Sequence, residues 1–218
     1  MPHGGIVRLV RDTDYCEFGP EETILQAASV CFDASTFEIF GALLNGGSLA
    51  LPPAGHLSLE SLSNCLEKHQ VSTLWLTAGL FQLMVEENLD AFAGVRQLLT
   101  GGDVVPVNHS AKLLKAFPAI RLINGYGPTE NTTFTTTHRI TPDDLKGDSI
   151  PIGKPIANTT AWILDESGNL VAPGIAGELC CGGDGLALEY WKNPELTAEK
   201  FILAKIGGGK EERFYRTG

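Results

Sequence analysis

The chain has 218 residues, 43% of them hydrophobic, which is enough to bury one large core or two small ones. Its formal charge of −10, from 26 acidic and 16 basic residues, argues against nucleic acid or an anionic membrane as a partner. Five cysteines without Cys-x-x-Cys spacing and five scattered histidines predict reduced thiols and no zinc site. The sequence has no signal-like or membrane-spanning run, so we expect a cytoplasmic protein.

Strand-like and helix-like segments alternate over the first 145 residues. Apolar runs predict strands at residues 23–32, 48–51, 71–76, 97–100 and 120–124. Apolar residues at helical spacing predict helices at residues 37–44, 57–69, 80–87 and 107–117, the first of them ended by Gly46 and Gly47. This alternation predicts an α/β fold in which helices cover both faces of a parallel sheet.

The composition changes near residues 142–155, where Pro, Asp, Lys and Gly replace the alternation. Further on, the sequence predicts strands at 161–164 and 177–181 around a turn at 165–169, then a short helix opening at Pro194 and a glycine loop at 207–209. We place a domain boundary near residue 150. Residues 1–150 are expected to form the α/β unit, and residues 151–218 a smaller β-rich unit.

Glycines and polar residues follow the predicted strands, and ligands of open parallel sheets bind at the carboxyl ends of the strands. The ends are Asp33-Ala34, Trp75-Leu76-Thr77, Thr100-Gly101-Gly102-Asp103 and Asn124-Gly125-Tyr126-Gly127-Pro128-Thr129-Glu130. In the last segment, glycines allow close backbone approach to a ligand. Thr129 and Glu130 add a hydroxyl and a carboxylate, which suit phosphate and magnesium.

Each of these residues also has an ordinary structural interpretation. Asp33 can cap a helix that begins at the Ser35-x-x-Glu38 capping-box pattern. The other ordinary roles are core positions for Phe37 and Trp75, a structural turn for Gly101 and Gly102, strand positions for Thr133 and Phe134, and a solvated side chain for Glu130.

Taken in order, the motifs resemble those of adenylation domains of nonribosomal peptide synthetases, within the acyl- and aminoacyl-adenylate-forming enzymes. The matching stretches are residues 32–47, beginning Phe32-Asp33-Ala34-Ser35, residues 124–130, Gly177-Glu178-Leu179 with Gly182-Gly183, Tyr190-Trp191, Pro194-Glu195-Leu196-Thr197 and Tyr215-Arg216-Thr217-Gly218. The resemblance spans the whole chain. It implies a flavodoxin-like parallel-sheet subdomain followed by an incomplete β-rich subdomain.

The resemblance also implies roles for the site residues. Asp33 would hold the α-ammonium of an amino acid substrate. The side-chain pocket would be lined by Ala34, Phe37, Trp75, Leu99, Gly101, Gly125, Thr133 and Phe134. This uncharged, aromatic lining favours a short aliphatic side chain and is similar to the family's valine-selecting pattern. Isoleucine differs by one methylene, worth about 1–3 kcal/mol, so some activation of isoleucine is expected.

The second substrate implied by the resemblance is ATP. Tyr126 would pack on the adenine, and Gly102, Asp103, Asn124 and Gly127 would lie near it. Thr129 would contact phosphate oxygens and Glu130 would ligate magnesium, so these two are the expected catalytic residues. The reaction implied is attack of the amino acid carboxylate on the α-phosphorus, giving an aminoacyl adenylate for a carrier-protein domain.

Several parts of the family pattern lie outside the matched stretches. The triphosphate-gripping loop precedes them, and the ribose-binding aspartate and the lid lysine follow them. We therefore expect an internal piece that is inactive alone.

Two other functions stay open: an acyl-CoA or aryl-acid ligase, which would have no use for the carboxylate of Asp33, and a module that binds an amino acid without activating it.

Overall fold

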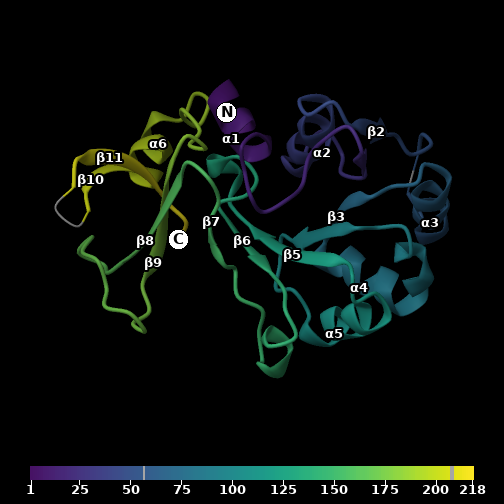
Figure 1. Ribbon diagram of the computed structural model, residues 1–218. Helices are drawn as coiled ribbons and strands as arrows, with labels where there is room; N and C mark the ends of the chain where they lie inside the picture. Colours follow the sequence, from purple (N-terminus) through teal and green to yellow (C-terminus); the bar gives the residue numbers. More distant parts are fainter. Residues whose placement is uncertain (56, 207–208) are drawn as a thin grey trace.

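The larger part of the molecule is a seven-stranded sheet with strand order β2-β1-β3-β4-β5-β6-β7 (Figure 1). The computed structural model describes residues 1–55, 57–206 and 209–218. Strands β1 to β5 are parallel, and β6 and β7 extend the sheet in antiparallel fashion. The bounds are β1 Thr23–Leu25, β2 Ser48–Ala50, β3 Thr73–Thr77, β4 Gln97–Gly101, β5 Arg121–Tyr126, β6 Thr136–Arg139 and β7 Lys154–Pro155. The order 2-1-3-4-5 is the flavodoxin-like one, so the predicted α/β fold is confirmed.

Helices cover both faces of this sheet because side chains alternate along each strand. Trp75, Leu99 and Ile123 are in register and pack against α1 (His3–Val10) and α2 (Ala34–Leu43). Their neighbours Leu74, Leu98 and Leu122 pack on the opposite face. The helices there are α3 (Leu59–Lys68), α4 (Ala78–Glu87) and α5 (Val107–Ala116). Figure 1 shows α2 on one side of the strands and α4 and α5 on the other.

A separate four-stranded antiparallel sheet follows, with strand order β10-β11-β9-β8. Its elements are β8 (Thr159–Leu164), β9 (Glu178–Gly183), α6 (Pro194–Lys200), β10 (Phe201–Lys205) and β11 (Glu211–Arg216). The predicted smaller β-rich unit is therefore present. The chain leaves the large sheet after Pro155 and enters the small one at Thr159, and the division at residue 150 stays a prediction.

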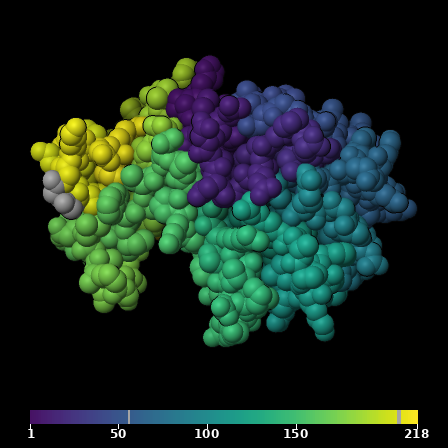
Figure 2. All heavy atoms as spheres, in the orientation of Figure 1, coloured from purple at the N-terminus to yellow at the C-terminus, as the bar shows by residue number. Residues whose placement is uncertain are grey.

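The N-terminal helix α1 joins the two sheets. Figure 2 shows the N-terminal segment across the top of the molecule, between the small sheet and the α2 region.

The remaining short elements are 3-10 turns at η1 (Leu89–Phe92), η2 (Thr129–Asn131) and η3 (Asp144–Lys146). Across the described residues, none of the helices has the length and hydrophobicity needed to span a membrane.

The predicted strand at 23–32 is wrong beyond Leu25. The backbone N–H groups of Ala27 and Ala28 donate to the side-chain carboxyl oxygens of Glu38 instead of a neighbouring strand, and Val30 and Phe32 are exposed. The predicted capping box is also wrong. The side chain of Glu38 accepts the N–H groups of Ala27 and Ala28, so it does not reach back to the start of its own helix. The predicted glycine loop at 207–209 falls largely on residues 207 and 208, outside the described residues.

Candidate functional site

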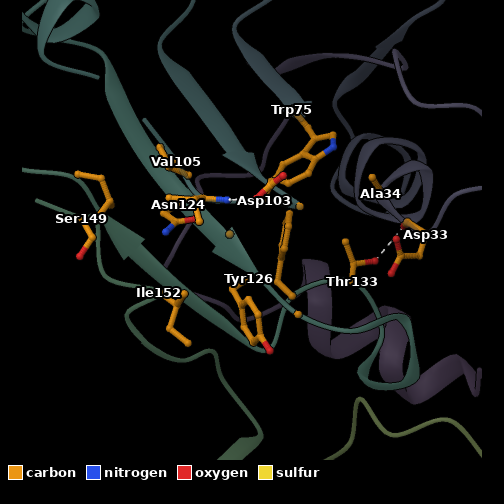
Figure 3. Close-up of a pocket in the computed structure, with 16 residues that line it drawn as sticks. Asp33, Ala34, Trp75, Asp103, Val105, Asn124, Tyr126, Thr133, Ser149 and Ile152 are labelled. Atoms are coloured by element: carbon orange, nitrogen blue, oxygen red, sulfur yellow. Dashed lines mark hydrogen bonds between the residues drawn. The ribbon is translucent and has the colours of Figure 1, made fainter. Parts of the chain in front are cut away.

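A cavity of about 500 Å³ opens at the carboxyl ends of β3, β4 and β5 (Figure 3). Helix α2, which follows β1, covers one face of the sheet, and helix α4, which follows β3, covers the other. The strand order therefore reverses between β1 and β3, and the cavity lies next to this point. Ligands of open α/β sheets bind at such switch points. The predicted site residues that line it are Asp33, Ala34, Trp75, Gly102, Asp103, Asn124, Gly125, Tyr126, Gly127, Thr133 and Phe134.

Two glycines at the strand ends allow aromatic rings to close the cavity. Gly101 and Gly125 are paired in register, and a Cβ on Gly101 would overlap the carbonyl oxygen of Gly125. A Cβ on Gly125 would lie 2.7 Å from the Phe134 ring. The rings of Trp75 and Phe134 meet with centroids 5.2 Å apart, and both side chains are buried. Gly101 therefore shapes the cavity wall without lining it.

Phe37 and Leu99, two of the predicted lining residues, lie behind the cavity wall. Both are fully buried in the same cluster as Trp75. The Phe37 ring lies 5.5 Å from that of Phe134, and Tyr15 packs edge-on against Phe134 at 5.8 Å. Phe134 is therefore packed against two rings that are not among the residues lining the cavity. Phe37 therefore occupies a core position, which is the ordinary structural role considered for it from the sequence.

Asp33 lies at the edge of the cavity, and among the described residues no side chain forms an ion pair with its carboxylate. It is the N-cap residue of α2, yet its side chain makes no capping hydrogen bond, so the capping interpretation is wrong. Its backbone carbonyl accepts a hydrogen bond from the hydroxyl of Thr133 at 2.9 Å. Among the described residues that line the cavity, the other charged side chain is Asp103. A carboxylate facing an otherwise largely apolar space is suited to a cationic group on a ligand.

The two sides of the cavity differ in chemistry. Figure 3 shows Asp33, Ala34 and Thr133 on one side and Asn124, Ser149 and Ile152 on the other, with Trp75 and Tyr126 between them. Asn124 is buried, and its amide donates to the carbonyl of Pro151 at 2.9 Å. The far side thus presents amide, hydroxyl and aliphatic groups.

Thr129 and Glu130 lie outside the cavity lining, on η2. Glu130 is half-buried rather than freely solvated, because one carboxylate oxygen accepts the hydroxyl of Tyr190 and its backbone carbonyl accepts the Ala187 N–H at 2.7 Å. Desolvation and the Glu130 carboxylate raise the pKa of Tyr190, so its hydroxyl stays a donor. Within the described ranges there is no cluster of three or more His, Cys, Asp or Glu side chains suited to a metal ion.

Comparison with known proteins identifies the family. Residues 1–191 match the family described as AMP-binding enzyme. The chain belongs to that family. It is 54% identical over its whole length to one of the linear gramicidin synthase proteins of Brevibacillus parabrevis, of which it covers 3%. It is 40% identical over its whole length to bacitracin synthase 1 of Bacillus licheniformis, of which it covers 4%.

Solved structures of this family have the same fold. A nonribosomal peptide synthetase protein containing adenylation and PCP domains, bound to a vinylsulfonamide inhibitor, superposes with a TM-score of 0.95 at 44% identity. That match covers 99% of this chain and 38% of the other. The Klebsiella oxytoca NpsA N-terminal subdomain in complex with 3-hydroxyanthranilyl-AMSN gives 0.91 at 31% identity, covering 99% and 55%. The resemblance to synthetase adenylation domains is confirmed.

Some of the residues that line the cavity have no role in the sequence prediction. Val104, Val105, Ser149, Ile150 and Ile152 also line the cavity. They come from the loops after β4 and before β7, whose paths no local pattern specifies. Tyr190 belongs to a recognised motif, but only the fold brings it to Glu130.

Proposed function

We propose that this chain supplies the amino-acid-selecting part of an adenylation domain, which uses ATP to convert valine or a similar small aliphatic amino acid to its aminoacyl adenylate. One observation carries the proposal most directly. The carboxylate of Asp33 lies at the edge of a largely apolar cavity whose described lining contains no cationic side chain. An α-ammonium group is the partner that this arrangement fits, because a charge-assisted hydrogen bond is strong where water is scarce.

The shape of the cavity supports a short aliphatic side chain. Trp75 and Phe134 reduce the space beside Asp33, and the strand-end glycines let both rings approach the backbone. Thr133 provides the one side-chain hydroxyl at this end, and that hydroxyl donates to the carbonyl of Asp33. An aromatic substrate would compete with the two rings for the same volume. Valine fits, and isoleucine is the expected close competitor.

ATP would occupy the other side. Tyr126 would pack on the adenine, next to Asn124 and the backbone of Gly102, Asp103 and Gly127. Thr129, which is exposed at the start of η2, would reach phosphate oxygens.

A single carboxylate such as Glu130 fits magnesium, which is commonly held by one or two carboxylates together with substrate phosphates. Bound there, magnesium would offset phosphate charge. Tyr190 would leave the second carboxylate oxygen of Glu130 open for the ion.

The chemistry asks mainly for positioning. A carboxylate oxygen of the amino acid attacks the α-phosphorus, the bond from that phosphorus to the bridging oxygen breaks, and pyrophosphate leaves. Asp33 orients the amino acid, and Tyr126 orients the nucleotide, so the reacting atoms meet in line. The product adenylate would pass to a carrier-protein domain of the parent synthetase. A cytoplasmic location stays a prediction.

Amino-acid-dependent exchange of labelled pyrophosphate into ATP tests this function. The protein is the complete adenylation domain containing residues 1–218. Valine is compared with isovalerate, which has the same branched chain without the α-ammonium, and with an aryl acid. We expect exchange with valine and at least about a hundredfold less with isovalerate, since a lost charged partner costs about 3 kcal/mol or more. Equal exchange with isovalerate or preference for the aryl acid indicates an acid ligase, and binding of valine without exchange indicates a binding module.

A further inference from the structure

Arg8 of α1 is buried and bonded to the backbone next to the cavity. Its side chain is 2% exposed. One terminal nitrogen donates to the carbonyls of Asn131 and Thr132 at 2.7 and 2.8 Å, and the other donates to the carbonyl of Phe134 at 2.9 Å. The second nitrogen also donates to the hydroxyl of Thr159 at 2.6 Å. No ion pair links Arg8 to a carboxylate in the part of the chain that the structure describes.

The segment that accepts these bonds, residues 131–134, has an unfavourable backbone conformation. Thr132 has a φ of 51° and Thr133 a φ of 65°. Consecutive left-handed conformations are unusual for β-branched residues and persist only where the surroundings hold them. Three carbonyls of this segment converge on the guanidinium of Arg8, which is the group that binds most of its backbone. The hydroxyl of Thr132 adds one further bond, to the carbonyl of Gly185 at 2.7 Å. The side chains of both Thr133 and Phe134 line the cavity.

We propose that Arg8 is a positioning residue for amino acid recognition. It holds the 131–134 segment in its left-handed conformation, so that Phe134 closes the cavity against Trp75 and the hydroxyl of Thr133 reaches the carbonyl of Asp33. This role rests on the proposed function of the cavity. Arg8 itself contacts none of the cavity space, and no residue of α1 lines it.

The guanidinium suits this task better than an ammonium group. Burial lowers the pKa of Arg8 to about 10, so the side chain remains charged at neutral pH. Its planar fork serves several carbonyls at once, whereas the single nitrogen of lysine is a compact and more strongly hydrated donor. Arg8→Lys therefore keeps the charge and removes most of the geometry.

A variant at Thr159 distinguishes two roles of Arg8, namely holding the 131–134 segment and joining the two sheets. Because Thr159 begins β8 of the small sheet, Arg8 also links the two sheets. Thr159→Val removes that link and leaves the three carbonyl contacts in place. If Arg8 acts through the 131–134 segment, only Arg8→Lys should disturb substrate recognition. If it acts by joining the sheets, both variants should do so.

Two readouts test the proposal in the complete adenylation domain. The first is hydrogen–deuterium exchange of amides 132–135, which requires no catalysis and therefore decides on Arg8 even if valine is not activated. The second is the KM for valine and for ATP in pyrophosphate exchange. If the proposed function is wrong, the wild-type domain itself shows no valine-dependent exchange, and this outcome is distinct from a failure of the Arg8 proposal. The matched control is Arg11→Lys, since Arg11 is also on the N-terminal segment but bonds the carbonyl of Leu44.

We expect Arg8→Lys to speed exchange of amides 132–135 and to raise the KM for valine about tenfold, with the KM for ATP unchanged. Arg11→Lys and Thr159→Val should change neither. If Arg8→Lys fails to fold, Arg8→Gln replaces it, because its neutral amide can still donate to part of the segment but cannot serve all three carbonyls. Unchanged amide exchange and valine KM in the variant, or the same losses in Thr159→Val, would overturn the proposal.

Discussion

Replacing Trp75 with alanine is expected to widen the amino acid pocket and change its selectivity. The indole is 7% exposed, lies on β3 and packs against Phe134 on the cavity side of the sheet. Truncation of a core tryptophan costs about 3–5 kcal/mol of stability. Part of the indole borders empty space rather than packed atoms, so we expect a loss near the lower figure, about 3 kcal/mol.

The effect on selectivity follows from the space that the indole leaves. Room for one further methylene changes discrimination by about 1–3 kcal/mol, or 10–200-fold, and an aromatic ring needs several such groups. The assay is pyrophosphate exchange by the complete adenylation domain with valine and with phenylalanine. We expect the ratio of kcat/KM for phenylalanine over valine to rise at least about tenfold.

Trp162→Ala is the matched control. Trp162 is half-buried on β8 and packs on the core of the small sheet. It should lose stability without any change in the phenylalanine-to-valine ratio. If Trp75→Ala also loses stability while its ratio stays at the wild-type value, Trp75 is a core residue only and the reasoning about the pocket fails.

Three other changes have defined outcomes. Asp33→Ala should lower kcat/KM for valine at least about 30-fold. A charge pair 4 Å apart is worth about 4 kcal/mol at an effective dielectric of 20, and the partial exposure of Asp33 reduces that value. Unchanged pyrophosphate exchange would exclude the α-ammonium role. Burial raises the pKa of Glu38 to about 8, against the opposing N–H donors of Ala28 and Ala27. Its contribution to stability is therefore largest below about pH 4.5 and is lost as the pH rises towards 8, by up to about 1.4 kcal/mol per pH unit. Tm measured from pH 5 to 8.5 should fall less in Glu38→Gln than in the wild type, and parallel curves would contradict this. Residues 1–218 alone should show no useful exchange, since loss of even one preorganised donor can cost about 10²–10³ in rate, and robust turnover would refute that expectation.

The parallel core of the fold could be predicted because its strands are continuous apolar runs between helical segments. Buried parallel strands produce that pattern on their own. The missed elements depend on distant parts of the chain. Helix α1 contains Gly4 and Gly5, which disfavour a helix, and it is held by packing and by Arg8. Strand β11 begins with charged residues and forms through pairing with β9 and β10.

The candidate site was partly predictable for a topological reason. Carboxyl ends of neighbouring parallel strands meet at one edge, so Trp75 and Gly125 could be placed together from their positions alone. The loop residues Ser149 and Ile152 could not, because tertiary contacts set their path. Arg8 could not either, since its acceptor Phe134 is 126 positions away. The true length of β1 depends on Glu38, because its carboxyl oxygens accept the N–H groups that would otherwise extend the strand.

The central claim is that this chain contains the pocket that selects the amino acid. The most direct test transfers residues 1–157, which complete the large sheet, into a related adenylation domain with a different amino acid preference. The measurement is pyrophosphate exchange by the chimera over a panel of amino acids. An active chimera that prefers valine or another small aliphatic amino acid agrees with the account. An active chimera that keeps the preference of its host contradicts it.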